Sequence, residues 1–182
     1  MTAPLGIHTG RVAWVFDDNF DVDQVVGVAN IKVQDVALQA PNAMAQFEPG
    51  FHTRVRPGGL LVAGRNFGYG HPHAIAMRTM RHLGITGVVA ESFFSSFWLG
   101  EVGYGFRLLA CPGIHAMARR GDELQVDWDA YTVTNRTTGQ SLSAVPHTQR
   151  EREILAHGGL KPMLAAQRRA GNEPSLTTGD NP

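Results

Sequence analysis

The chain has 182 residues, 43% of them hydrophobic and 18% charged, which is the composition of a soluble globular protein with a core of its own. Sixteen basic residues balance sixteen acidic ones, so no field of one sign exists to attract nucleic acid or an anionic membrane, and we expect neither as a partner. No apolar run approaches the ~18 residues of a membrane span, and residues 1–10 lack the apolar segment of a secretory signal.

The first predicted strand covers residues 11–16, after a short N-terminal extension at residues 1–10. The strand ends at a run of aspartates, and Asp18, Asp21 and Asp23 lie close enough together to suggest calcium. The EF-hand pattern also needs a central glycine and a terminal glutamate at fixed offsets, and both are missing. We therefore interpret this segment as a polar loop, which either lies on the surface or contributes to a site.

The middle of the chain predicts a strand, a glycine-rich turn and a helix in succession. The apolar run at residues 59–63 is the strand, the turn follows at 64–70, and apolar residues at helical spacing indicate a helix over 72–83. Glycines let the backbone approach a ligand, and the free N–H groups of a helix amino end favour an anion, so this turn is the main candidate site. A second apolar run at residues 87–90 completes a strand–helix–strand unit, which favours a right-handed crossover and parallel pairing.

The next segment predicts a second helix and a third strand. Ser92 is a suitable N-cap for the helix, and the strand covers residues 107–110. Directly after it lies Cys111, the one cysteine, which cannot form a disulfide within the chain and which we expect to be buried and structural. A chain with one reduced thiol is compatible with a reducing cytoplasm, where we expect the protein to act.

The C-terminal third of the chain changes character. Alternating apolar and polar residues over 124–145 predict an antiparallel meander with one solvent-facing side. A helix is expected from about Gln149 and a second short one from about Leu160, followed by a flexible tail at residues 166–182. The chain is therefore expected to form one folded domain at residues 11–165, between the extension and the tail.

Four short motifs follow one another in a fixed order along the chain. Their sequences are Asp18-Asn19-Phe20-Asp21-Val22-Asp23-Gln24, Gly64-Arg65-Asn66-Phe67-Gly68-Tyr69-Gly70, Val88-Val89-Ala90-Glu91-Ser92-Phe93 and Ile154-Leu155-Ala156-His157-Gly158-Gly159-Leu160. Together they resemble the small subunit of 3-isopropylmalate dehydratase, which corresponds to the swivel domain of the aconitase superfamily. The resemblance covers about residues 10–165.

This resemblance implies an α/β fold, the swivelling β/β/α domain of the aconitase C-terminal type, with a mixed parallel and antiparallel sheet and flanking helices. It also implies a hydro-lyase (a dehydratase, or an isomerase) that removes water from a small hydroxy acid and adds it back. In the family, a large partner subunit holds a [4Fe–4S] cluster, while the small subunit closes the site and supplies a base and an anion clamp. We expect no cofactor on this chain, whose single cysteine could not hold a cluster, and a heterodimer or heterotetramer with the large dehydratase subunit.

The catalytic turn of this chain departs from the family. Where the family has Gly-Ser-Ser-Arg, the sequence here is Gly70-His71-Pro72-His73. By position, His71 replaces the serine base, Pro72 replaces a serine that helps to hold the substrate, and His73 replaces an arginine that pairs with a substrate carboxylate. Imidazole can abstract a proton, so His71 is the expected catalytic base, and Pro72 fits the first position of a helix. The expected substrate-binding residues are His73, Pro72, Gly70, Gly68, Asn66, Asp23 and Gln24.

Two hypotheses follow from these departures: a working hydro-lyase with an altered substrate, or a catalytically silent paralogue kept for assembly or regulation. A second family arginine and an asparagine are replaced by Leu99 and Gly100, and the loop at residues 28–32 lacks the Tyr-Leu-Arg run of isopropylmalate enzymes, which argues against leucine biosynthesis. A metal site at His71 and His73 is a third hypothesis, but zinc needs three or four ligands, so we expect no metal. The remaining histidines are expected at the surface or as helix caps: His8, His52, His82, His115, His147 and His157.

Overall fold

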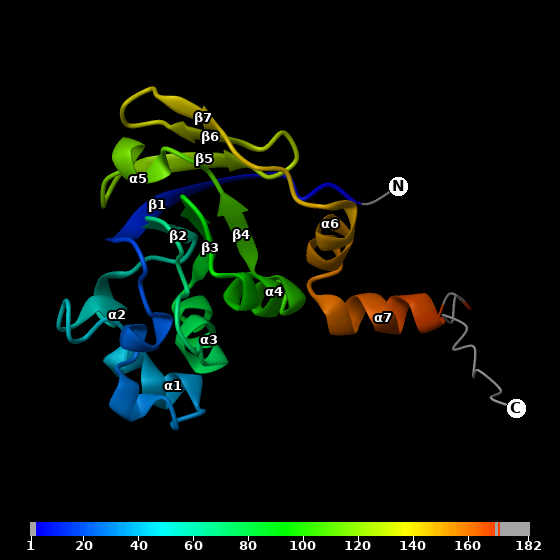
Figure 1. The fold of residues 1–182 in the computed structure, drawn as a ribbon. Helices are drawn as coiled ribbons and strands as arrows, with labels where there is room; N and C mark the ends of the chain where they lie inside the picture. The colour runs from blue at the N-terminus through cyan, green and yellow to red at the C-terminus, as the bar shows by residue number, and fades with distance from the viewer. Residues whose placement is uncertain (1–2, 170, 172–182) are drawn as a thin grey trace, which may run out of the picture.

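The computed structural model describes residues 3–169 and residue 171. This part of the chain contains a seven-stranded sheet in the order β4-β3-β2-β1-β5-β6-β7 (Figure 1). β1 to β4 pair in parallel and β5 to β7 continue the sheet in antiparallel pairs, which confirms the predicted mixed sheet. The strands are β1 (Ile7–Phe16), β2 (Gly59–Ala63), β3 (Ile85–Ala90), β4 (Arg107–Ala110), β5 (Glu123–Asp127), β6 (Thr132–Asn135) and β7 (Ser141–Ser143).

The two kinds of pairing meet on β1. Its amino half pairs antiparallel with β5, from Ile7 opposite Asp127, and its carboxyl half pairs in parallel with β2, ending with Phe16 opposite Ala63. β3 continues the parallel part with Ala90 beside Ala63. The carboxyl ends of β1, β2 and β3 are therefore neighbours at one edge of the sheet, where ligands bind in open α/β sheets.

Helices make the crossovers that parallel strands need. α3 (Ala74–His82) connects β2 to β3, and α4 (Ser95–Gly103) connects β3 to β4, as the sequence predicts. Figure 1 shows α1 to α4 away from the β5–β7 layer, with α6 and α7 beside α4. The other helical segments are η1 (Val22–Val25), η2 (Val28–Asn30), α1 (Val36–Gln39), η3 (Ala40–Asn42), α2 (Phe51–Arg54), α5 (Ile114–Met117), α6 (Gln149–Ala156) and α7 (Leu160–Arg169).

An aromatic cluster ties the loops at this sheet edge to the core. The rings of Phe16 and Phe20 lie 4.3 Å apart between centroids, and Phe67, which is fully buried, lies 5.3 Å from Phe16 and 5.4 Å from Phe97. Each such pair contributes about 0.5–1.5 kcal/mol beyond the burial of its apolar area. The glycine-rich turn after β2 is therefore anchored at Phe67 to the end of β1 and to α4.

The first strand and the last helix both extend past the bounds predicted for the folded domain. β1 begins at Ile7, inside the predicted N-terminal extension, because residues 7–11 form backbone pairs with β5, a partner more than 110 residues away in sequence. At the other end α7 continues to Arg169, past the predicted boundary at residue 165. The rest of the predicted flexible tail, residues 170 and 172–182, lies outside the described residues.

Two helices begin later than the sequence predicts. α3 starts at Ala74 with His73 as its N-cap, so Pro72 lies before the helix and not at its first position. α4 starts at Ser95 with Phe94 as its N-cap, because the hydroxyl of Ser92 accepts a hydrogen bond from the backbone N–H of Asn66 and is used to hold the turn. In both cases a contact with a distant loop fixes the start of the helix.

Two side chains near β4 are buried. Burial raises the pKa of the Cys111 thiol to about 11, and the Glu91 carboxylate adds to this effect, so the expectation of a buried structural cysteine is confirmed. His147 is also buried, with its Nε2 2.7 Å from the carbonyl oxygen of Leu108 and its ring stacked on Trp98. The expectation that His147 lies at the surface or caps a helix is therefore wrong, since the segment before α6 packs its ring against β4 and α4.

Within residues 3–169, no helix is long and apolar enough to cross a membrane.

Candidate functional site

Backbone and side-chain hydrogen bonds dock the turn after β2 against the loop after β1. The N–H of Arg65 donates to Asp18 Oδ1 over 2.6 Å, and the N–H of Asn19 donates to the carbonyl of Arg65 over 2.8 Å. Asn66 has a positive φ of 56°, a left-handed conformation that asparagine tolerates well, and its Nδ2 donates to Asn19 Oδ1 over 2.8 Å. Asn66 thus holds two loops together through its side chain.

The loop after β3 holds the same turn from its other side. The N–H of Phe67 donates to the carbonyl of Ser92 over 3.0 Å, and the N–H of Phe94 donates to the carbonyl of Phe67 over 2.9 Å. The Ser92 hydroxyl accepts from the N–H of Asn66 over 2.9 Å. The turn is therefore fixed between the loops that follow β1 and β3, which gives the side chains after it a defined position.

The two glycines predicted to contact the substrate have different surroundings. Gly68 is buried with a φ of +84°, and a Cβ built on it would lie 2.2 Å from Cγ of Phe97. Gly70 is partly exposed with a φ of +99°, and its Cβ would meet Asp21 at an ordinary distance of 3.6 Å. Gly68 is thus required for packing of the turn against α4, and at Gly70 the backbone conformation alone favours glycine.

Asp23 and His73 form the most specific contact of the site. His73 Nδ1 lies 2.7 Å from Asp23 Oδ2, and the His73 backbone N–H donates to Asp23 Oδ1 over 2.8 Å. Asp23 is 6% exposed, whereas the His73 side chain is 50% exposed. Asp21 caps η1 by accepting from the N–H of Asp23, which fixes the carboxylate in turn. The Asp23 carboxylate therefore sets the orientation of a half-exposed imidazole.

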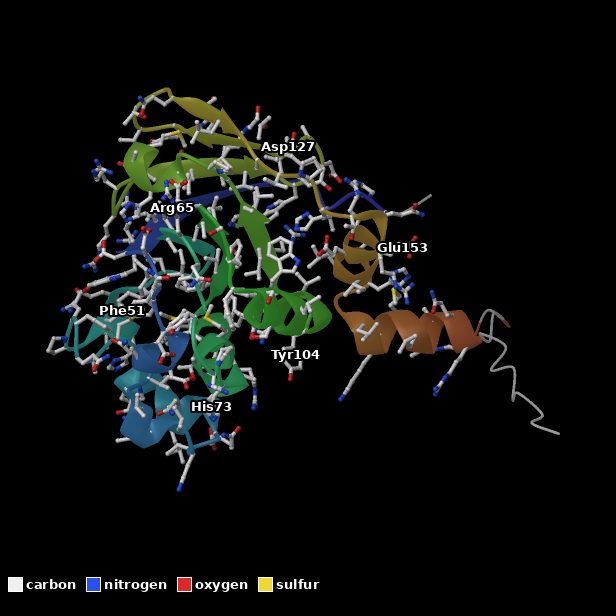
Figure 2. The ribbon with its side chains drawn as sticks, in the orientation of Figure 1. Phe51, Arg65, His73, Tyr104, Asp127 and Glu153 are labelled. Carbon is white, nitrogen blue, oxygen red and sulfur yellow. The ribbon has the colours of Figure 1, made fainter. Side chains whose placement is uncertain are left out.

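This contact also changes the expected anion site at the start of α3. The free N–H groups there were expected to face a ligand, but the N–H of the N-cap residue His73 is already bound by the chain's own Asp23. A carboxylate at a helix amino end is favourable, so Asp23 stabilises α3 as well as the imidazole. Figure 2 shows His73 at the end of α3, beside the segment that carries η1 and α1.

The remaining predicted site residues lie near this pair. His71 is exposed, Pro72 is partly exposed, and both belong to the loop between the glycine-rich turn and α3. No hydrogen bond or ion pair joins the His71 side chain to the residues that the structure describes. Gln24 lies in η1 with its side chain exposed, and its carbonyl accepts a hydrogen bond from Gln46 Nε2 over 2.8 Å. The structure thus gathers the predicted residues at one edge but directly joins Asp23 and His73 alone among them.

The donor set of the described residues does not suit a metal centre. Within residues 3–169 and 171, no three His, Cys, Asp or Glu side chains are grouped so that they could hold a metal ion. The one thiol, on Cys111, is buried at the end of β4 with a raised pKa, whereas metal ligation needs a thiolate. The residues of this chain therefore do not fit an iron–sulfur cluster.

Sequence reasoning missed three functions in the site. It did not pair Asp23 with His73, and it did not identify Asn19 and Ser92 as residues that hold the turn. The one sequence signal was the position of Asp18 to Asp23 directly after a strand, since loops that follow neighbouring parallel strands meet at one edge. Which side chains pair across that edge depends on the register of the strands.

No family model matches the chain. The chain is 36% identical over 148 residues to the 3-isopropylmalate dehydratase small subunit of Pyrobaculum calidifontis, covering 81% of this chain and 91% of that protein. It is 34% identical over 163 residues to the isopropylmalate/citramalate isomerase small subunit of Methanocaldococcus jannaschii, covering 87% of this chain and 94% of that protein.

A solved structure agrees with these relatives. The crystal structure of 3-isopropylmalate dehydratase (leuD) from Methanocaldococcus jannaschii superimposes with a TM-score of 0.81 at 27% identity, covering 91% of this chain and 97% of that one. The match covers most of both chains, and it confirms the expected fold. With relatives at this identity over most of its length, the chain belongs to the family of 3-isopropylmalate dehydratase small subunits.

Proposed function

We propose that this chain is the small subunit of a heteromeric aconitase-type hydro-lyase, which closes over a site on a larger partner subunit and supplies a base and a substrate clamp. The observation that carries the proposal is the Asp23–His73 pair, which joins η1, after β1, to the start of α3, after β2. An imidazole fixed by a buried carboxylate, at the sheet edge where ligands bind, is the arrangement that acid–base and anion-binding sites use.

His73 is the proposed clamp. With Nδ1–H donated to Asp23, the Nε2 atom is the one left for a ligand. In the imidazolium form Nε2–H can donate to a substrate carboxylate, with Asp23 balancing the positive charge. One donor replaces the two of an arginine fork, so the clamp suits a substrate with a smaller or less anionic group at this position.

His71 is the proposed general base. Its side chain is exposed on the same loop, two residues from the clamp, where a partner subunit and substrate could cover it. A neutral imidazole can take the proton next to a carboxylate, a contribution of about 10²–10⁴-fold in rate. Asn66, Gly70, Pro72 and Gln24 complete the proposed substrate contacts, whereas Asp23 and Gly68 act as supports, because His73 occupies both oxygens of Asp23 and Phe97 packs on Gly68.

The proposed cofactor belongs to the partner. The residues of this chain do not fit a cluster, so a [4Fe–4S] cluster would be held by the large subunit, as the family resemblance implies. When bound, such a cluster supplies a Lewis acid for the substrate hydroxyl. This chain's residues bind, orient and exchange a proton with the substrate, and we expect both subunits in the cytoplasm.

The proposed substrate is a small hydroxy acid that differs from isopropylmalate. One relative is named an isopropylmalate/citramalate isomerase small subunit, so relatives within this family differ in the substrate that their names give. Here Leu99 occupies the position of a family arginine and is 69% exposed on α4, which removes an anion contact. The altered turn and Leu99 both favour a substrate with fewer negative groups.

The proposal is tested by co-producing the chain anaerobically with a large dehydratase subunit encoded by the same genome. We expect a stable heteromer that dehydrates at least one member of a panel of 2- and 3-hydroxy acids, their esters and their amides. A heteromer that forms but dehydrates none of them would favour the silent paralogue, and failure of any large subunit to bind would contradict the heteromeric function itself.

A further inference from the structure

A cavity of about 460 Å³ lies at the end of the sheet opposite the candidate site. Its walls are Thr9–Ala13 of β1, residues of the segment from Phe51 to Gly59, and the turn around Arg120 and Gly121. The catalytic turn begins after Ala63, the last residue of β2, whereas this cavity lies at Gly59, the first. Five strand residues, or about 17 Å, separate the two.

The cavity is lined by four arginines and one carboxylate. The arginines are Arg11, Arg54, Arg56 and Arg120, and the carboxylate belongs to Glu123. Because the chain carries equal numbers of basic and acidic residues, this grouping concentrates positive charge that is absent from the chain as a whole. A cavity of this size is in the range of small-molecule sites.

Two of the guanidinium groups are held in place by one partly buried glutamate. Arg54 Nη2 lies 2.7 Å from Glu48 Oε1, and Arg120 Nη2 contacts the other oxygen, Oε2. The Arg120 guanidinium also lies over the ring of Trp14, 4.6 Å from its centroid. These contacts fix two otherwise flexible side chains before a ligand arrives, which reduces the entropy that binding would cost.

The other two arginines keep their charge unpaired. Neither Arg11 nor Arg56 forms an ion pair with any residue in the described part of the chain, and both are exposed. The lining carboxylate, Glu123, has its own partner in Arg136, with a separation of 3.6 Å. The cavity therefore retains two guanidinium forks that can donate to an added anion.

The backbone explains why no side chain fills this space. β1 leaves β5 and joins β2 here, with a bulge between Val12 and Trp14. Gly58 and Gly121 line the cavity with positive φ values of +86° and +91°. A Cβ on Gly121 would meet nothing within 4 Å, so its backbone faces open space.

We propose that this cavity binds a small polyanion, either a phosphate ester or a polycarboxylate, through Arg11 and Arg56 with Arg54 and Arg120 as fixed neighbours. Guanidinium groups bind carboxylate and phosphate in the same two-pronged geometry, so the chemistry covers both ligand types. The inference does not depend on the proposed function, since it concerns a different end of the sheet and needs no partner subunit.

The test is calorimetric titration of the full chain with pyrophosphate and, separately, with citrate in 150 mM NaCl. We expect saturable one-to-one binding of at least one probe, weakened tenfold or more in the double variant Arg11→Gln/Arg56→Gln. The matched control is Arg78→Gln/Arg168→Gln, which removes the same charge from two exposed arginines outside the cavity and is expected to bind like the wild type.

The probe that binds identifies the ligand type: pyrophosphate alone indicates a phosphate ester, and citrate alone a polycarboxylate. Amide chemical-shift changes on titration are expected at Gly58 and Gly121, which gives a readout on the unsubstituted protein should the double variant fold poorly. The proposal is overturned if neither probe saturates, if the control pair weakens binding as much as the cavity pair, or if the shift changes centre elsewhere.

Discussion

The carboxylate of Asp23 binds His73 twice, at the backbone N–H and at Nδ1 of the ring, across a sequence separation of 50 residues. One contact lies at the start of α3 and the other orients an imidazole, so a single buried carboxylate fixes both the start of this helix and the direction of the His73 ring. Both carboxylate oxygens are used in this way, which makes Asp23 a positioning residue.

Replacement of Asp23 by Asn should release the His73 ring. The Asn side chain has one oxygen, which can still accept from the backbone N–H of His73. Its NH₂ group then lies where Asp23 Oδ2 now accepts from Nδ1–H, so the ring loses its acceptor. In ¹⁵N spectra of the isolated chain we expect the wild-type His73 to carry its proton on Nδ1, and the variant to lose that preference. Asp18→Asn, on the same loop but bound to Arg65, is the control and should leave the His73 signals unchanged. An unchanged tautomer in Asp23→Asn would remove the positioning role.

Substitution of Gly68 by Ala should destabilise the fold through a clash. The methyl group would lie 2.2 Å from Cγ and 2.6 Å from Cβ of Phe97, atoms near the backbone of α4 that cannot move away easily. Gly139→Ala is a matched control, because its φ of +80° is similar to the +84° of Gly68 but nothing lies within 4 Å of its Cβ. We expect a loss of about 1 kcal/mol in the control and about 3 kcal/mol or more in Gly68→Ala, measured by urea unfolding. Equal losses would show that strain alone explains this glycine.

Glu101 should make stability fall as pH rises. Burial raises the pKa of its carboxyl from 4.5 to about 7, although the Arg81 guanidinium, 3.4 Å away, opposes the shift. Since the fold favours the neutral form, the contribution of Glu101 to the free energy of unfolding is fully present below pH 4.5. It is lost as the pH rises to about 7 and above. The loss is on the order of 3 kcal/mol for a shift of this size.

The measurement for Glu101 is the free energy of unfolding of Glu101→Gln and wild type between pH 4.5 and 8. The variant should lose less stability across this interval, because the amide does not ionise. Glu153→Gln, which removes a partly exposed carboxylate of α6, should keep the wild-type slope. Parallel curves for Glu101→Gln and wild type would contradict the assigned pKa.

The thiol of Cys111 should be unreactive in the native protein. It is fully buried, and burial raises its pKa from the usual 9.0 to about 11, so thiolate is scarce at pH 8. We expect reaction with an aromatic disulfide reagent to be at least about 100-fold slower than after unfolding in urea. Comparable rates in the two states would mean that the end of β4 opens readily.

Local sequence patterns were sufficient for much of the fold. The strands at 59–63 and 107–110 have the bounds that their apolar runs predict, and α6 begins at Gln149 after a Thr148 capping box. These elements are defined by burial or capping within a few residues. The first residues of β1, 7–10, were not predicted, because His8 and Gly10 carry no strand signal of their own and are ordered by pairing with β5.

The site was harder to predict because its contacts join distant segments. The family resemblance located the turn, but it could not tell that Asp23 pairs with His73, that Ser92 holds Asn66 and does not cap α4, or that Gly68 is reserved for Phe97. Each of these depends on the register in which β1, β2 and β3 lie side by side. That register is a property of the whole sheet, and no local pattern encodes it.

The proposed function depends on His71 as the base and His73 as the clamp of this subunit. Its most direct test is the steady-state dehydration rate of the purified heteromer carrying His71→Ala, His73→Ala or the control His157→Ala, where His157 caps α6 away from the turn. We predict that His71→Ala lowers kcat by about 10²–10⁴-fold, that His73→Ala mainly raises KM, and that the control matches wild type. Heteromers with wild-type kcat and KM in both turn variants would contradict the roles proposed for His71 and His73.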